Sequence, residues 1–181
     1  MNIGPIADTV LILIFAGLLV AAAHSDIRRF EIPNRLPVAI VLLFPFHVIA
    51  LQSFTGAPVG WLISGITAVS VFAVGTALFA FGLFGGGDVK LLSAASLWAG
   101  PHALPALLLV MSVTGAGLAL AFIARARLAP AGRNTGERAL DATETAGIQL
   151  PYGVAIALGG LVALVGPFSH ALSNWSIAHV V

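Results

Sequence analysis

Long stretches of apolar residues alternate along this chain with short polar segments. Residues 9–23 carry no charge, and residues 36–87 contain no Asp, Glu, Lys or Arg. The second stretch is broken near 52–58 by Ser, Thr, Gly and Pro, which are typical of turns. Because a helix that crosses a bilayer needs about 20 mostly apolar residues, the first half of the chain predicts three membrane helices, near 9–23, 36–51 and 59–83.

The second half of the chain predicts further helices. A short apolar helix over 89–99 is expected to end at Gly100, which is followed by proline, and another helix is expected near 104–124. The last predicted helix lies near 150–167. The pattern therefore predicts an all-α polytopic membrane protein of about six transmembrane helices, with residues 1–181 forming a single membrane-embedded domain.

Charged residues are concentrated in three polar segments. With six spans and both termini on one side, the segments 24–35, 84–90 and 125–149 share the opposite face. They hold all eight Lys and Arg residues and six of the seven acids, Asp8 being the exception. The excess of Lys and Arg places these segments in the cytoplasm. The tail, 168–181, is left unassigned between a half-span, an interfacial helix and a frayed end.

The composition supports this class and excludes others. Hydrophobic residues make up 59% of the chain and charged residues 8%, against about 25% charged in soluble domains. The absence of Cys excludes disulfides, thiolate nucleophiles and cysteine zinc sites. No basic stripe with interleaved aromatic side chains is present, so nucleic acid is not an expected partner, whereas the lipid bilayer is. The N-terminus lacks the basic residues of a cleavable signal peptide, so the first segment is expected to remain as a helix.

Two aspartates stand out because carboxylates near hydrocarbon are costly and usually functional. Asp26 and Asp88 lie at the ends of apolar stretches that the topology places on the same cytoplasmic boundary. Two carboxyl groups in close approach cannot both ionise easily, so one holds a proton at neutral pH. One can then take a proton from water while the other protonates the carbonyl oxygen or the leaving amine. This is aspartic-protease chemistry without metal or cofactor, and the pattern does not assign the base, because such a pair titrates as a unit.

Each of these residues also has a structural interpretation. Asp88 follows three glycines and suits a helix N-cap, a role compatible with catalysis. Asp26 is near Arg28 and could form an ordinary ion pair at the headgroups. Lys90 is either an interfacial cation or a charge that tunes the pair or meets an acidic substrate. His24 is near Asp26, but further ligands are lacking, so no metal site is predicted.

Three motifs resemble those of the type IV prepilin peptidases, membrane aspartic proteases with a GxGD signature. The first is Asp26 followed by Ile32-Pro33-Asn34, similar to the family's Asp before Ile-Pro-Asn. The second is Gly85-Gly86-Gly87-Asp88-Val89-Lys90-Leu91, similar to Gly-x-Gly-Asp-x-Lys-Leu. The third is Pro151-Tyr152-Gly153, similar to Pro-x-Gly before the last helix. Together the three motifs extend the resemblance over nearly the whole chain.

The resemblance implies that Asp26 and Asp88 are the catalytic pair and that the other motif residues support the substrate site. Those supporting residues are Pro33, Asn34, Gly85, Gly87, Lys90, Pro151 and Gly153. The implied reaction removes the short leader of a type IV prepilin or pseudopilin at the cytoplasmic face of the bacterial inner membrane. An archaeal preflagellin peptidase is the nearest alternative.

The chain departs from larger family members, which carry a four-cysteine zinc domain and also methylate the new N-terminus. Since Cys is absent, neither zinc nor methyltransferase activity is expected. The chain resembles the short, peptidase-only branch that serves Flp-type (tight adherence) pili. The oligomeric state stays open, a homo-oligomer included.

Two other function classes remain as alternatives. A small proton-coupled transporter could use Asp26 and Asp88 as a relay, although carriers usually place such groups near the bilayer midplane. A scaffold subunit of a pilus machine would tolerate changes at both aspartates.

Overall fold

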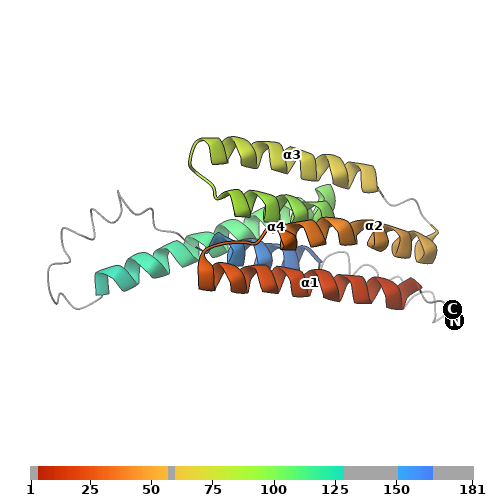
Figure 1. The fold of residues 1–181 in the computed structure, drawn as a ribbon, viewed down its shortest axis with the longest axis horizontal. Helices are drawn as coiled ribbons and strands as arrows, with labels where there is room; N and C mark the ends of the chain where they lie inside the picture. The colour runs from red at the N-terminus through yellow and green to blue at the C-terminus, as the bar shows by residue number, and fades with distance from the viewer. Residues whose placement is uncertain (1–3, 57–59, 129–150, 165–181) are drawn as a thin grey trace.

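The computed structural model describes residues 4–56, 60–128 and 151–164 of the chain (Figure 1). All regular structure in these ranges is helical, as the apolar stretches predicted. Four labelled helices are joined by short connections, and one further helix follows near the end of the described residues. The helices are α1 (Gly4–Arg29), α2 (Arg35–Thr55), α3 (Trp61–Ala80), α4 (Gly86–Leu128) and Tyr152–Leu164.

The four labelled helices are long and apolar enough to cross a membrane, whereas Tyr152–Leu164 is a shorter apolar helix. The chain is therefore a multi-pass membrane protein by the composition of its helices. The sequence predicted about six spans, and the described residues contain four candidate spans, so the count of six stays a prediction. The tail 168–181 and most of the 125–149 segment lie outside the described residues.

α4 is two helical segments joined at a sharp break. Gly100 has φ 61° and ψ −177°, a backbone conformation outside the helical region that glycine adopts readily. Pro101 follows and has no N–H to continue the helical ladder. Figure 1 shows the chain reversing direction here, so the two segments correspond to the helices predicted near 89–99 and 104–124.

The end of α1 differs from the prediction. The polar segment 24–35 was expected to be a loop, yet α1 continues to Arg29 and places Asp26 in its last helical turns. The helix ends at Phe30, whose φ of 52° is in the left-handed region and turns the chain toward α2. The Ser25 hydroxyl donates a 2.9 Å hydrogen bond to the Glu31 carbonyl and holds the connection against α1.

The buried core lies between α1, α2, the first segment of α4 and the last helix. Its fully buried members include Phe15, Leu19, Ile40, Leu91 and Ile156, drawn from all four of these elements. α1 packs on α2, and both α2 and α3 pack on α4. Much of α3 remains exposed, as expected for a helix that faces lipid.

Trp98 in α4 connects the helices across this core. Its ring stacks on Phe15 at a centroid distance of 4.3 Å and meets Phe44 edge-on at 5.9 Å. The indole N–H donates a 3.0 Å hydrogen bond to the Ile40 carbonyl. The buried polar atom of this large side chain is therefore satisfied, and α1, α2 and α4 are held in one arrangement.

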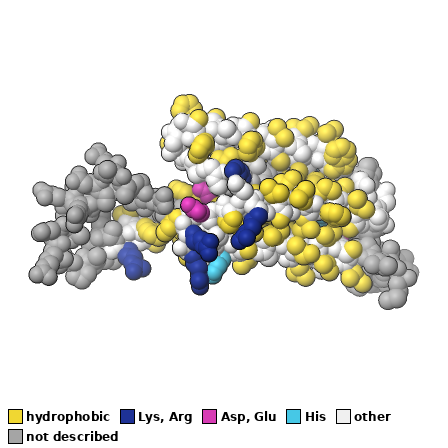
Figure 2. Space-filling model, viewed as in Figure 1, with side chains coloured by type: hydrophobic (Ala, Val, Ile, Leu, Met, Phe, Trp, Pro, Cys, Tyr) yellow, Lys and Arg dark blue, Asp and Glu magenta, His cyan; other side chains and the backbone are white. Residues whose placement is uncertain are grey.

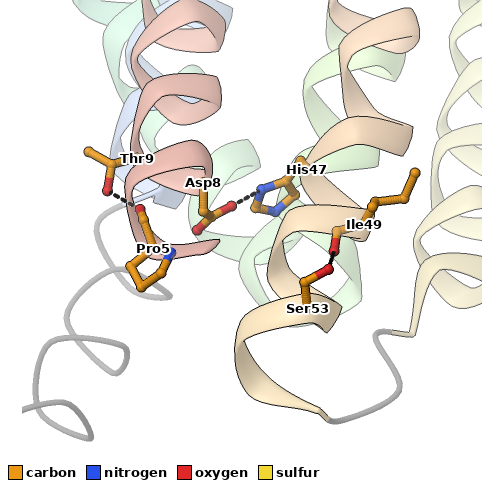
Figure 3. Close-up of polar contacts among 6 residues, drawn as sticks. All are labelled: Pro5, Asp8, Thr9, His47, Ile49 and Ser53. Carbon is orange, nitrogen blue, oxygen red and sulfur yellow. Dashed lines mark hydrogen bonds and ion pairs between the residues drawn. The ribbon is translucent and has the colours of Figure 1, made fainter. Parts of the chain in front are cut away.

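A hydrogen bond between side chains joins α1 to α2 at the end of the bundle nearer the N-terminus (Figure 3). His47 Nδ1 lies 2.6 Å from Asp8 Oδ1, with the two side chains only 16% and 17% exposed. The His47 ring also stacks on Trp98 at 4.7 Å. Asp8, the one acid outside the three polar segments, thus has a partner that the sequence did not indicate.

We expect Asp8→Asn to lower the free energy of unfolding by about 1–3 kcal/mol, because a shielded hydrogen bond to a carboxylate is replaced by a weaker one to a neutral amide. Thermal unfolding of the purified protein in detergent, followed by circular dichroism, measures the change. Ser53→Ala is the control, since it removes an exposed hydroxyl bond to the Ile49 carbonyl on the same α2 (Figure 3). An unfolding midpoint for Asp8→Asn equal to that of Ser53→Ala would contradict this role.

Candidate active site

Polar groups gather at the opposite end of the bundle from the Asp8–His47 pair. The end of α1, the start of α2, the end of α3 and the start of α4 meet there (Figure 1). Figure 2 shows that charged side chains cluster in this region, while apolar side chains cover much of the visible helical surface. This distribution matches the charge asymmetry of the sequence.

Asp26 is held at this end by a backbone amide of another helix. Its side chain is 5% exposed, and its Oδ2 accepts a 2.7 Å hydrogen bond from the Gly153 N–H. Gly153 is in the first turn of Tyr152–Leu164, where N–H groups have no intrahelical partner and favour a negative charge. The carboxyl group is therefore fixed by a residue 127 positions away in the chain.

Glycine is needed at position 153 for this contact. A Cβ there would lie 2.8 Å from Asp26 Oδ2 and 3.0 Å from Ile32 Cδ1, closer than ordinary van der Waals contact. The small residue in the Pro-x-Gly motif thus has a direct packing reason. Pro151 precedes the helix, and its carbonyl accepts a 3.2 Å bond from the Val154 N–H.

Asp88 occupies the first turn of α4 rather than the N-cap position itself. Its carboxylate accepts a hydrogen bond from the backbone N–H of Gly85, the residue just before the helix. This is the reach-back half of a capping box, so the capping interpretation of Asp88 holds in a modified form. A Cβ on Gly85 would lie 2.5 Å from Asp88 Oδ2, which explains why a bare backbone is required here.

Gly87 opens the same region to the connection between α1 and α2. A Cβ on Gly87 would lie 3.2 Å from the Ile32 Cβ. The connection and the start of α4 therefore approach each other closely. This approach brings the Ile32-Pro33-Asn34 motif beside the glycine-rich turn, two motifs that are more than fifty residues apart in the chain.

Both aspartates line one cavity of about 510 Å³ at this end of the bundle. The two carboxyl groups are near enough for the Asp26 charge to act on Asp88. The glycine-rich turn borders the cavity as well, so backbone as well as side chains face the space. Two carboxyl groups and exposed backbone therefore share one space at this end of the bundle.

Asn34 and Lys90 lie at the edge of this cavity. Lys90 Nζ donates a 2.8 Å hydrogen bond to Asn34 Oδ1, and Asn34 also lines the cavity. Asn34 occupies the N-cap position of α2, but its side chain makes no capping hydrogen bond. Its side chain therefore orients the lysine, which does not itself line the cavity of the aspartates.

The predicted site residues thus divide into three groups. Asp26, Asp88, Gly85, Gly87 and Asn34 line the cavity. Gly153 and Lys90 each contact one of these residues through a hydrogen bond. Pro33 and Pro151 supply backbone carbonyls to the turns that begin the neighbouring helices.

Sequence reasoning missed several residues that line the cavity. Tyr152 and Phe84 both do so, with ring centroids 6.2 Å apart. Phe30 and Ile32 close the side toward the α1–α2 connection. Ile32 and Tyr152 lie within two of the motifs, Tyr152 at the variable place of Pro-x-Gly, but the sequence assigned neither a role in the site. Phe30 and Phe84 belong to no chemical pattern that distinguishes them from other aromatic residues of the chain.

A comparison with protein-family models decides the family. The model of the type IV leader peptidase family matches residues 13–120. The chain belongs to the type IV leader peptidase family. No curated protein and no solved structure matched the chain in the corresponding searches.

Membership in this family identifies the chain as an aspartic-type prepilin peptidase, a hydrolase. The matched range contains both aspartates and the first two motifs. The Pro151-Tyr152-Gly153 motif lies beyond the match, and the Gly153–Asp26 hydrogen bond joins it to the matched part. In the parts that the structure describes, no group of three or more His, Asp or Glu side chains could hold a metal ion.

Proposed function

We propose that this peptidase removes the short leader of Flp-type prepilins or pseudopilins, with Asp26 and Asp88 as its catalytic pair. The observation that carries the proposal is the shared cavity, in which each carboxyl group is fixed by a backbone N–H. Carboxyl groups that are already held in place need little reorganisation during the reaction. Preorganised polar groups accelerate reactions mainly in this way. The whole chain acts as a single membrane-embedded domain.

Hydrolysis in this cavity needs one ionised and one protonated carboxyl group. The ionised group takes a proton from water as the water oxygen bonds to the scissile carbonyl carbon. The protonated group donates its proton to the carbonyl oxygen. The first carboxyl group then gives its proton to the amine while the second carboxylate takes a proton back from a hydroxyl of the tetrahedral intermediate, and the C–N bond breaks. The products are a free leader carboxylate and a new N-terminus, and no further reactant is consumed.

The glycine-rich turn supports binding of the substrate in an extended conformation. Gly85 and Gly87 present backbone without side chains on the cavity wall. Extended peptides commonly bind through main-chain hydrogen bonds to such exposed backbone. Larger residues at these positions would fill the space beside Asp88 or displace Ile32.

In this proposal the chain crosses the inner membrane six times, and the active site faces the cytoplasm. Arg28, Arg29 and Lys90 are exposed at the same end as the cavity, and the Lys/Arg bias favours the cytoplasmic side for such segments. α4 has a break at Gly100, and we propose that its two segments are separate crossings. Tyr152–Leu164, about 20 Å long at 1.5 Å per residue, would be the core of the sixth.

The Flp-type substrate is proposed from the resemblance of the motifs to the short, peptidase-only branch of the family. Larger members of the family carry a four-cysteine zinc domain and methylate the product, whereas this chain has no Cys. We therefore expect leader cleavage without methyl transfer. The transporter alternative gains no support, because both carboxyl groups lie near helix ends on one side of the bundle.

Co-expression with candidate substrates tests the proposal. A Flp-type prepilin, a pseudopilin and an archaeal preflagellin would each be expressed with the wild-type chain, and leader removal would be followed by gel shift. We expect the Flp-type prepilin and the pseudopilin to be shortened. Cleavage of preflagellin alone would overturn the assigned substrate class, and no cleavage of any substrate by well-inserted protein would overturn the function.

A further inference from the structure

A second, apolar groove lies beside the proposed active site, between α2 and α3. Its volume is about 730 Å³, and its lining is almost entirely apolar. One wall is formed by Gly65, Ala68, Val69 and Phe72 of α3, which repeat at the spacing of one helical face. The start of α2 forms the other wall, and the first segment of α4 forms the floor.

The packing of the helices explains why this groove is open. α2 and α3 each pack on α4, but they do not pack on each other to a comparable extent. The α3 wall is lined by small residues at its centre, and a Cβ added at Gly65 would meet nothing within 4 Å. Small residues let another helix approach closely within a membrane, so the shape suits a helix better than a bulky polar ligand.

The groove is continuous with the cavity of the aspartates. Asn34 lines both spaces. Lys90, bonded to Asn34, lies at the same end of the groove. From Lys90 the floor runs along α4 to Leu97, a distance of about 10 Å at 1.5 Å per residue. The groove therefore begins where the catalytic cavity ends and extends for about two helical turns.

We infer that this groove binds the apolar segment of the substrate, as a helix of about two turns packed against α3. The inference rests on the proposed function, in which the leader is removed while the apolar segment stays in the membrane. In such a substrate, the bond cut at Asp26 and Asp88 lies directly before the apolar segment. Two described apolar spaces share a lining residue with the cavity, and the groove, at about 730 Å³ against about 340 Å³, is the larger. It therefore positions the scissile bond by holding the adjoining helix.

Cross-linking tests the position of the substrate directly. Because the chain has no Cys, a single introduced cysteine gives an unambiguous signal. Val69→Cys places the thiol on the groove wall, at a position 69% exposed. Val74→Cys is the matched control, since Val74 is also a valine, is 62% exposed and lies five residues along α3 on a different face, which does not line the groove. The substrate is a prepilin with one cysteine in its apolar segment.

We expect disulfide cross-links to the substrate from Val69→Cys and at least about tenfold fewer from Val74→Cys, because only one helix face is covered. Equal cross-linking from both positions, or cross-linking from Val74→Cys alone, would overturn the groove assignment. The same preparations are tested for cleavage before oxidation. Failure of cleavage would count against the proposed function, whereas cleavage without selective cross-linking would count against the groove alone.

Filling the groove provides an independent measurement. Ala68→Leu adds three carbon atoms to the α3 wall of the groove, and Ala73→Leu adds the same atoms to a surface outside it. We expect Ala68→Leu to lower kcat/KM for the prepilin by about tenfold or more, since displacement of a substrate by an ångström can cost about a hundredfold. Wild-type kcat/KM for both variants would overturn the inference and leave lipid acyl chains as the occupant of the groove.

Discussion

Replacement of either Asp26 or Asp88 by Asn is expected to lower the rate of leader removal by about a thousandfold or more, the order of loss seen when a hydrolase loses a catalytic group. Asn has nearly the shape of Asp but cannot exchange a proton with water or with the leaving amine. Because both residues lie at helix ends and not in the apolar core, the variants should still insert. Initial cleavage rates in detergent and the amount of membrane-inserted protein measure the two effects separately.

The matched control for this prediction is Asp8→Asn. It makes the same chemical change in α1 but at the end of the bundle that holds the His47 pair. We expect it to cleave at the wild-type rate although it is less stable, so a loss of stability alone cannot account for inactive variants. Cleavage by either Asp26→Asn or Asp88→Asn within about tenfold of wild type would show that the two carboxyl groups are not a catalytic pair.

Gly153→Ala is expected to lower the cleavage rate by about ten- to a hundredfold, because a displacement of about an ångström at a catalytic group is enough to cause such a loss. The added methyl group would lie 2.8 Å from Asp26 Oδ2 and 3.0 Å from Ile32 Cδ1. Either the carboxyl group or the last helix must then move, and the 2.7 Å hydrogen bond from the Gly153 N–H is lengthened. The substitution removes no reactive group, so its effect reports on positioning.

Gly17→Ala serves as the control for this prediction, because Gly17 is also helical and a Cβ there would meet nothing within 4 Å. It should leave the cleavage rate unchanged. Thermal unfolding of both variants shows how much of any loss is structural. Wild-type activity in Gly153→Ala would mean that the amide contact to Asp26 does not position the carboxyl group.

The predictable part of the fold follows from hydropathy and helix-breaking residues. α2 and α3 match the predicted apolar stretches to within a few residues, since most of their surface faces lipid. The break in α4 falls at Gly100, where a Gly-Pro pair ended the predicted helix. The end of α1 differs from the prediction, which treated the polar residues after Ala23 as a loop. Polar residues can continue a helix, and Arg28 and Arg29 in the last turn of α1 interact favourably with the helix dipole.

The predicted topology gave the membrane boundary at which the candidate site lies, but not the contacts within the site. Charge asymmetry placed Asp26 and Asp88 at one boundary, and the structure brings both into one cavity. The contact between Asp26 and Gly153 spans 127 residues, so no local pattern indicates it. The resemblance named Gly153 as a supporting residue, but the reason for a glycine there became visible only once the last helix was placed against α1.

The pH dependence of the wild-type cleavage rate tests most directly whether two carboxyl groups act together. At low pH both groups are protonated and no base remains, whereas at high pH both are ionised and no acid remains. A pair that shares one proton therefore gives a bell-shaped profile whose limbs belong to the pair as a unit. A purified, folded enzyme whose rate rises or falls in one direction only across the range in which it stays folded would contradict the account.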